Sequence, residues 1–192
     1  MFAPKVLIIP GSTRSGSRNE RLAAAAGFQF VQAGADVTRI SLADFPLPIY
    51  DADLQDKSGV PRHALNLKRM IGAHHGVLLV TPEYNGSIPA LLKNAIDWVS
   101  RVPDPQESRG EVFRARPFAI ASASEGRLGG IRALAALRLI LSACHATVIP
   151  NQLALSFADQ AYDELDRLKQ PGDSEALAAL ARQLIAFSQQ ML

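Results

Sequence analysis

The chain has 192 residues, of which 48% are hydrophobic and 20% charged, and its formal net charge is +2. This length and hydrophobic fraction suit one compact core, so we expect residues 1–192 to form a single domain. The small net charge, with Lys and Arg scattered along the chain, argues against nucleic acid or an anionic membrane as a partner.

The N-terminal residues lead into a strand rather than a signal peptide, and no apolar run reaches membrane-spanning length, so the cytoplasm is the expected location. Cys144 is the only cysteine, which excludes an internal disulfide and a multi-cysteine metal site. The four histidines have no spacing typical of metal ligands, so no metal site is predicted.

The first predicted strand, residues 5–10, ends in a loop suited to an anion. Residues 20–26 have the composition of a helix, so residues 11–19 connect a strand end to a helix start. Such a junction directs backbone N–H groups and the positive end of the helix dipole at one place. Four hydroxyl groups crowd the same loop, from Ser12, Thr13, Ser15 and Ser17.

The loop departs from the common nucleotide motifs. Ser17 and Arg18 stand where a nucleoside triphosphate loop needs Lys followed by Ser or Thr, and Thr13 replaces the second glycine of the dinucleotide fingerprint. We therefore predict a site for one terminal phosphate, with Arg14 or Arg18 as the charge partner. The alternative is a capping box made by Ser17 and Glu20, which needs no ligand.

The next predicted elements lead to a second polar loop. They are a helix over residues 18–33, an edge strand over 37–42, a long loop from 44 to 59, a helix from 61 to about 73 and a buried strand over 76–80. The strand ends in the loop 81–87, where Asn85 and Gly86 form a turn pair. Because no alternating strand follows, we expect a helix to residue 100 rather than a hairpin.

The second half of the chain repeats the pattern. The predicted elements are a connection over residues 101–116, a strand over 117–121, a small-residue loop over 122–130, a helix over 131–143, a short strand over 147–149 stopped by Pro150, and a helix from 158 that is broken near 171–172. Five strands alternating with helices predict an α/β protein with a doubly wound parallel sheet.

In such a sheet, ligands lie outside the carboxyl ends of the strands, where the strand order reverses. With the order 2-1-3-4-5, the loops after the first and third strands meet at that point. The ligand should then extend from the phosphate loop towards Tyr84 and Asn85, where Glu83 and Asn85 suit the hydrogen-bonding edge of a flat ring. The alternative is that Tyr84 packs against a helix and Asn85–Gly86 only turns the chain.

These loops resemble those of a known family. Residues 11–19, GSTRSGSRN, look like the phosphate loop of the NADPH-dependent FMN reductase family, flavodoxin-like proteins that include quinone, azo-dye and chromate reductases. Residues 81–89, TPEYNGSIP, followed by LKNAIDW at 92–98, are similar to its flavin-ring loop and the helix after it. Ser122 and Ser124 with Gly129–Gly130 resemble its third flavin loop, and the resemblance spans about residues 5–150.

The resemblance implies a flavodoxin-like five-stranded sheet with helices on both faces and a homodimer or homotetramer with the flavin near a subunit interface. It also implies two groups of cofactor residues. The FMN phosphate would be held by Ser12, Arg14, Ser17 and Asn19. The isoalloxazine ring would be held by Pro82, Glu83, Tyr84, Asn85 and Gly86, with Ser124 alongside. Substrate choice is expected to depend on residues 44–59 and 101–116, which the motifs fix least.

The leading hypothesis is an FMN-dependent oxidoreductase that takes hydride from NADPH or NADH and passes electrons to a small acceptor. Candidate acceptors are a quinone, an azo compound, free flavin and a metal oxyanion such as chromate. The flavin supplies the chemistry, so no side chain is nominated as a catalytic acid, base or nucleophile. A second hypothesis is a flavodoxin-type electron carrier that docks to redox partner proteins, although the slight basic excess favours the enzyme. A third is a flavin-free sensor of a phosphate ligand.

Overall fold

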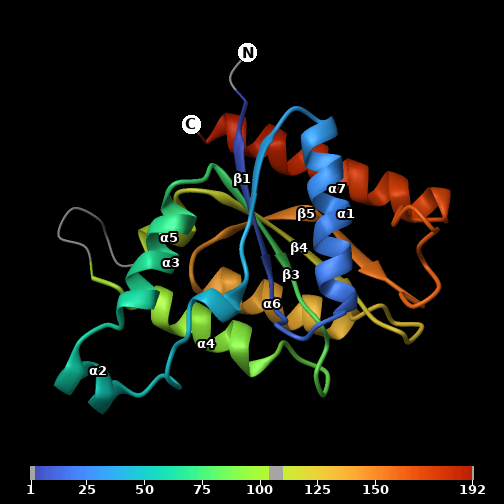
Figure 1. Cartoon of the computed structure of the whole chain (residues 1–192). Helices are drawn as coiled ribbons and strands as arrows, with labels where there is room; N and C mark the ends of the chain where they lie inside the picture. Colours follow the sequence, from blue (N-terminus) through green and yellow to red (C-terminus); the bar gives the residue numbers. More distant parts are fainter. Residues whose placement is uncertain (1–2, 104–109, 192) are drawn as a thin grey trace.

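The computed structural model describes residues 3–103 and 110–191, and its centre is one five-stranded parallel sheet (Figure 1). The strands are β1 (Lys5–Pro10), β2 (Asp36–Arg39), β3 (Gly76–Val80), β4 (Pro117–Ala123) and β5 (Thr147–Leu155). Their order is β2-β1-β3-β4-β5, and every pair is parallel. The predicted doubly wound sheet and its strand order are confirmed.

Helices cover both faces of the sheet. One face packs against α1 (Arg18–Gln32) and α7 (Pro171–Gln190), and the other against α3 (Arg62–Gly72), α4 (Ala90–Val99), α5 (Glu111–Arg114) and α6 (Ile131–Ala143). Successive residues of β1 alternate between the two cores: Ile8 belongs to the α1/α7 side, and Leu7 and Ile9 to the other. A strand buried on both faces accounts for the continuous apolar run in its sequence.

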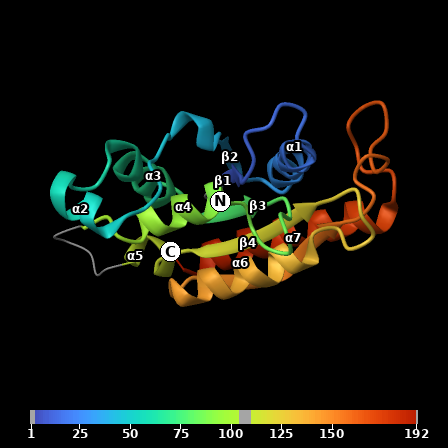
Figure 2. The same ribbon diagram turned by 90° about the horizontal axis from the view of Figure 1, so that it is seen from below.

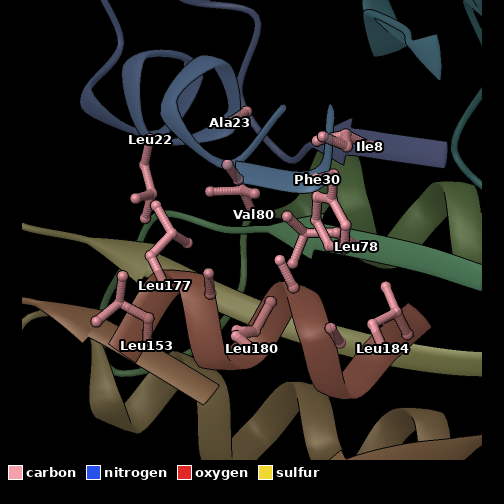
Figure 3. Close-up of a cluster of buried hydrophobic side chains, with 14 of the residues drawn as sticks. Ile8, Leu22, Ala23, Phe30, Leu78, Val80, Leu153, Leu177, Leu180 and Leu184 are labelled. Atoms are coloured by element: carbon pink, nitrogen blue, oxygen red, sulfur yellow. The ribbon is translucent and has the colours of Figure 1, made fainter. Parts of the chain in front are cut away.

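The core between the sheet, α1 and α7 sets the position of the first loop. Ile8, Leu78 and Val80 from the strands meet side chains of both helices there (Figure 3). The helix residues are Leu22, Ala23 and Phe30 of α1 and Leu177, Leu180 and Leu184 of α7. Each fully buried large side chain contributes roughly 1.5–3 kcal/mol. This packing fixes the N-terminus of α1 beside the carboxyl ends of β1 and β3.

The fifth strand is longer than predicted. We expected Pro150 to end it, but β5 runs from Thr147 to Leu155. The register shifts between Phe118 and Ile120 of β4, so that residues 149–151 of β5 bulge past a single residue. A proline is tolerated there because β5 is an edge strand, and a bulged position makes no ladder hydrogen bond.

Two connections also differ from prediction. The loop over residues 44–59 contains the helix α2 (Ala52–Ser58), which Asp51 caps by accepting from the Leu54 N–H at 2.9 Å. The helix predicted from residue 158 is wrong: residues 156–170 form turns, and Pro171 is at the first turn of α7 rather than at a break. Figure 2 shows α2 and this turn-rich connection at opposite ends of the molecule.

The structure describes only part of the predicted connection over residues 101–116. Residues 104–109 of it lie outside the described residues, and α5 occupies 111–114. Within residues 3–103 and 110–191, no helix has the length and apolar character needed to cross a membrane.

Candidate functional site

Three loops meet at the carboxyl edge of the sheet and enclose a pocket of about 180 Å³. They follow β1, β3 and β4, as the strand order requires, because β1 and β3 are neighbours at the switch point. The lining residues are Ser12, Arg14, Ser17, Arg18, Asn19, Pro82, Glu83, Tyr84, Ala123, Ser124 and Glu125. Of the predicted site residues, Asn85 and Gly86 do not line this pocket.

The first loop offers free donors to an anion. In the described structure, the backbone N–H groups of Thr13, Ser15 and Gly16 have no hydrogen-bond partner. Arg14 is exposed, and its guanidinium group forms no ion pair with any described residue. Unpaired N–H groups beside a helix N-terminus, with a free guanidinium group, suit a phosphate.

Ser17 caps α1, but the capping box predicted as an alternative does not form. The Ser17 hydroxyl accepts from the Asn19 N–H at 3.3 Å, while the Ser17 N–H donates to the Arg14 carbonyl at 3.1 Å instead of to Glu20. Burial raises the pKa of Glu20, and the nearby Arg39 partly offsets that rise. A cap therefore explains Ser17 and leaves the other donors of the loop unexplained.

Asn19 joins the first loop to the third. Its buried amide donates to the Ala123 carbonyl at 3.0 Å and accepts from the Ala123 N–H at 2.9 Å. Both polar ends of the side chain are thus engaged with the end of β4, inside the wall of the pocket. Contact between the Asn19 side chain and a phosphate stays a prediction.

Arg18 and Glu125, which the resemblance did not assign, face each other across the pocket. They form an ion pair in which the side chains are 30% and 65% exposed. The Arg18 Nε is buried and has no hydrogen-bond partner among the described residues. No local pattern of residues predicts this pair, because the two residues lie in different loops and meet only in the folded sheet.

The second loop presents an exposed tight turn. The Tyr84 N–H donates to the Ser87 carbonyl at 2.9 Å, and the Ser87 N–H donates to the Tyr84 carbonyl at 3.1 Å. Between them, Asn85 and Gly86 have φ values of 52° and 78°, the geometry of a type I′ turn. Tyr84 is 52% exposed, so its side chain is not buried against a helix.

Glu83 anchors this turn to α6. Its carboxylate accepts from the Arg132 Nε at 2.6 Å and from the backbone N–H groups of Arg132 and Ala133 at 3.2 and 3.4 Å. Burial alone would raise the pKa of Glu83, but these hydrogen bonds and the Arg132 charge outweigh it and lower the pKa. The side chain is 8% exposed, so it is directed at the helix N-terminus rather than at solvent.

The third loop brings α6 close to β4. Gly130 has φ +88°, and a Cβ atom there would overlap the hydroxyl of Ser122 and lie 2.8 Å from its Cβ. A Cβ on Gly129 would lie 2.5 Å from the Ala154 carbonyl oxygen. The glycine pair therefore permits this close approach. Ser124, half-buried at the pocket, accepts from the Gly126 N–H at 3.3 Å.

A parallel sheet of this order, with a phosphate-type loop at its switch point and an exposed aromatic turn beside it, defines a flavodoxin-like mononucleotide-binding protein. The model of the NADPH-dependent FMN reductase family matches residues 4–160, and the chain belongs to this family.

Individual relatives support this family assignment. A quinone reductase of Escherichia coli is 40% identical over 146 residues, 76% of this chain and 73% of that protein. An NAD(P)H-dependent FMN reductase of Pseudomonas aeruginosa is 37% identical over 186 residues, 95% of this chain and 92% of that protein. The solved structure of FerB, an NAD(P)H:acceptor oxidoreductase of Paracoccus denitrificans, has a TM-score of 0.81 at 25% identity and covers 98% of this chain and 99% of that one.

The chain is therefore an oxidoreductase that uses FMN with NADPH or NADH. This confirms the leading hypothesis over the flavodoxin-type carrier. The pocket fits the cofactor, because a phosphate monoester requires cationic and N–H donors. The first loop provides them in the unpaired Arg18 Nε, the free Arg14 guanidinium group and its unpaired backbone N–H groups.

Proposed function

We propose that this enzyme reduces quinones, with electrons that pass from NAD(P)H through FMN held between the three loops. The likeness to the quinone reductase of Escherichia coli supports this acceptor class. The observation that carries the proposal is the pocket itself: unpaired cationic and N–H donors lie at one end of a cradle whose other end is an exposed turn bearing Tyr84.

In this proposal the named residues bind and orient the cofactor, and the proton that quinone reduction also consumes is not assigned to any of them. Arg14, the N–H groups of Thr13, Ser15 and Gly16, and the hydroxyls of Ser12 and Ser17 bind the phosphate. The turn at Tyr84, Asn85 and Gly86 contacts the ring, with Pro82 and Ser124 beside it, while Glu83 holds the turn in place. Bound FMN supplies the redox chemistry by accepting a hydride and passing electrons on.

We also propose that the enzyme is a homodimer or homotetramer in the cytoplasm. The supporting observation is a set of exposed apolar side chains in and after the second and third loops. They are Tyr84, Leu91, Leu128 and Ile131, each at least 39% exposed. Apolar groups gathered beside a site are typical of a contact surface.

The test is turnover by the purified protein loaded with FMN. NADPH should bleach the flavin absorbance, and a simple benzoquinone should restore it while NADPH is consumed in stoichiometric amounts. An azo dye and chromate, run as alternative acceptors, show whether the acceptor range extends beyond quinones. Bound flavin that NADPH does not bleach would contradict the proposal, and so would bleached flavin that quinone does not reoxidise.

A further inference from the structure

The ion pair between Arg18 and Glu125 crosses the phosphate end of the pocket. Arg18 is the first residue of α1, and Glu125 lies in the loop after β4. Both residues line the pocket together with Arg14. Two guanidinium groups, those of Arg14 and Arg18, are available to a phosphate in this pocket. The Glu125 carboxylate pairs with that of Arg18, inside the site where the phosphate would bind.

This ion pair is not needed to hold the two loops together. The buried amide of Asn19 already joins them at the base of the pocket, through two hydrogen bonds to the Ala123 backbone at 2.9 and 3.0 Å. The Glu125 side chain is 65% exposed, so it can leave Arg18 without opening a buried contact. An exposed ion pair of this kind contributes little to folding. We therefore expect the Arg18–Glu125 ion pair to change the affinity of the pocket for an anion rather than the stability of the fold.

The charges of the pocket separate into two pairs. Glu83 is neutralised by Arg132 and by the N-terminus of α6, and it forms no ion pair with the described residues of the first loop. Glu125 instead forms its ion pair with Arg18, whose Nε has no hydrogen-bond partner among the described residues. A phosphate monoester carries close to two negative charges at neutral pH and prefers guanidinium donors. It would compete with Glu125 for Arg18, and it would meet repulsion from the displaced carboxylate.

We infer that Glu125 is an internal competitor of the FMN phosphate, which weakens FMN binding and favours cofactor exchange. The inference deepens the proposed function and rests on it, because it takes FMN as the ligand of this pocket. Glu125 acts here through Arg18 and is thus an affinity-determining residue. It takes no part in electron transfer.

The test is a set of flavin titrations, followed by quenching of flavin fluorescence, on the wild type, Glu125→Gln, Arg18→Gln and the double variant. Riboflavin, which lacks the phosphate, is the matched ligand. Glu125→Gln should lower the FMN dissociation constant roughly three- to fivefold, the value of a partly exposed ion pair, and leave riboflavin binding unchanged. In the Arg18→Gln background, the same substitution should give a clearly smaller gain.

Glu164→Gln is the control variant, because Glu164 is an exposed glutamate outside this pocket and its substitution makes the same change in net charge. The inference would be overturned if Glu125→Gln weakened FMN binding or left it unchanged. It would also be overturned if riboflavin gained equally, if Glu164→Gln gave the same gain, or if the gain persisted in full without Arg18. Failure of both the wild type and Glu125→Gln to bind FMN would instead overturn the proposed function, and the inference with it.

Discussion

Glu83 shows how a residue that looks like a ligand group can serve the site indirectly. Its place in the polar loop after β3 suggested contact with the flavin ring, yet its carboxylate is bonded to Arg132 and to the start of α6. What the sequence could not show is the partner, because Arg132 lies on another helix and reaches Glu83 only in the folded chain. In the proposed function, the ring contacts of this loop therefore come from the turn at Tyr84, Asn85 and Gly86, with Pro82 beside it.

The lowered pKa of Glu83 makes its contribution depend on pH. The folded-state pKa lies below the ordinary value of 4.5, so the stabilisation is present above that value and is lost as pH falls through the folded pKa. We expect Glu83→Gln to cost about 1–2 kcal/mol of unfolding free energy at pH 7, since it weakens a charged helix cap. At an acid pH below the folded-state pKa the cost should shrink, because the wild-type carboxyl group is then also protonated.

Urea unfolding of both proteins at the two pH values measures this difference. Glu164→Gln, which removes an exposed carboxylate with no hydrogen bond to any described residue, controls for the change in net charge. An equal loss at both pH values would mean that the ionised form of Glu83 does not supply the stabilisation.

At the scale of elements, the contact between α6 and β4 depends on Gly130. Replacing it with alanine adds a Cβ that overlaps the Ser122 hydroxyl, at a φ of +88°. We expect Gly130→Ala to cost roughly 2 to 4 kcal/mol, from overpacking and backbone strain together. Thermal unfolding should show a lowered Tm, and Ser122→Gly in the same chain should restore the steric part of the loss.

Gly172→Ala is the control, because the added Cβ would have no atom within 4 Å apart from its chain neighbours and the backbone of its own helix, and Gly172 is in the first turn of α7. Its Tm should stay level or rise slightly, since alanine restricts the unfolded chain. A similar loss in both variants would show that the close approach of α6 to β4 is not the cause.

Two of the differences between prediction and structure share a physical reason. The sequence predicts breaks at Pro150 and Pro171, but a proline is accommodated in an edge bulge and in the first turn of a helix. Local sequence does not reveal whether a strand lies at the edge of a sheet. The strands buried on both faces, β1 and β3, were predicted correctly because their apolar runs reflect burial directly.

For the whole molecule, the alternation of strands and helices predicts a doubly wound parallel sheet, and the strand order follows from the resemblance to flavodoxin-like proteins rather than from the alternation. The first loop could be predicted as an anion site because its hydroxyls, its arginines and its place between a strand and a helix are local properties of residues 11–19. Partners from distant loops could not be predicted: Asn19 with Ala123, and Arg18 with Glu125, meet only across the sheet. Those contacts determine which polar groups of the loop remain free.

The central claim is that the first loop binds the FMN phosphate. The most direct test of this claim is the ratio of the protein's affinities for FMN and for riboflavin, which lacks the phosphate. The wild type should bind FMN at least about tenfold more tightly, and Arg14→Ala should reduce that preference about tenfold or more, as expected for the loss of a charge-assisted hydrogen bond. Riboflavin binding should not change. Arg127→Ala, at an exposed arginine outside the pocket, should leave the ratio intact. Equal binding of the two flavins by the wild type, or an equal loss for both in Arg14→Ala, would contradict the assignment.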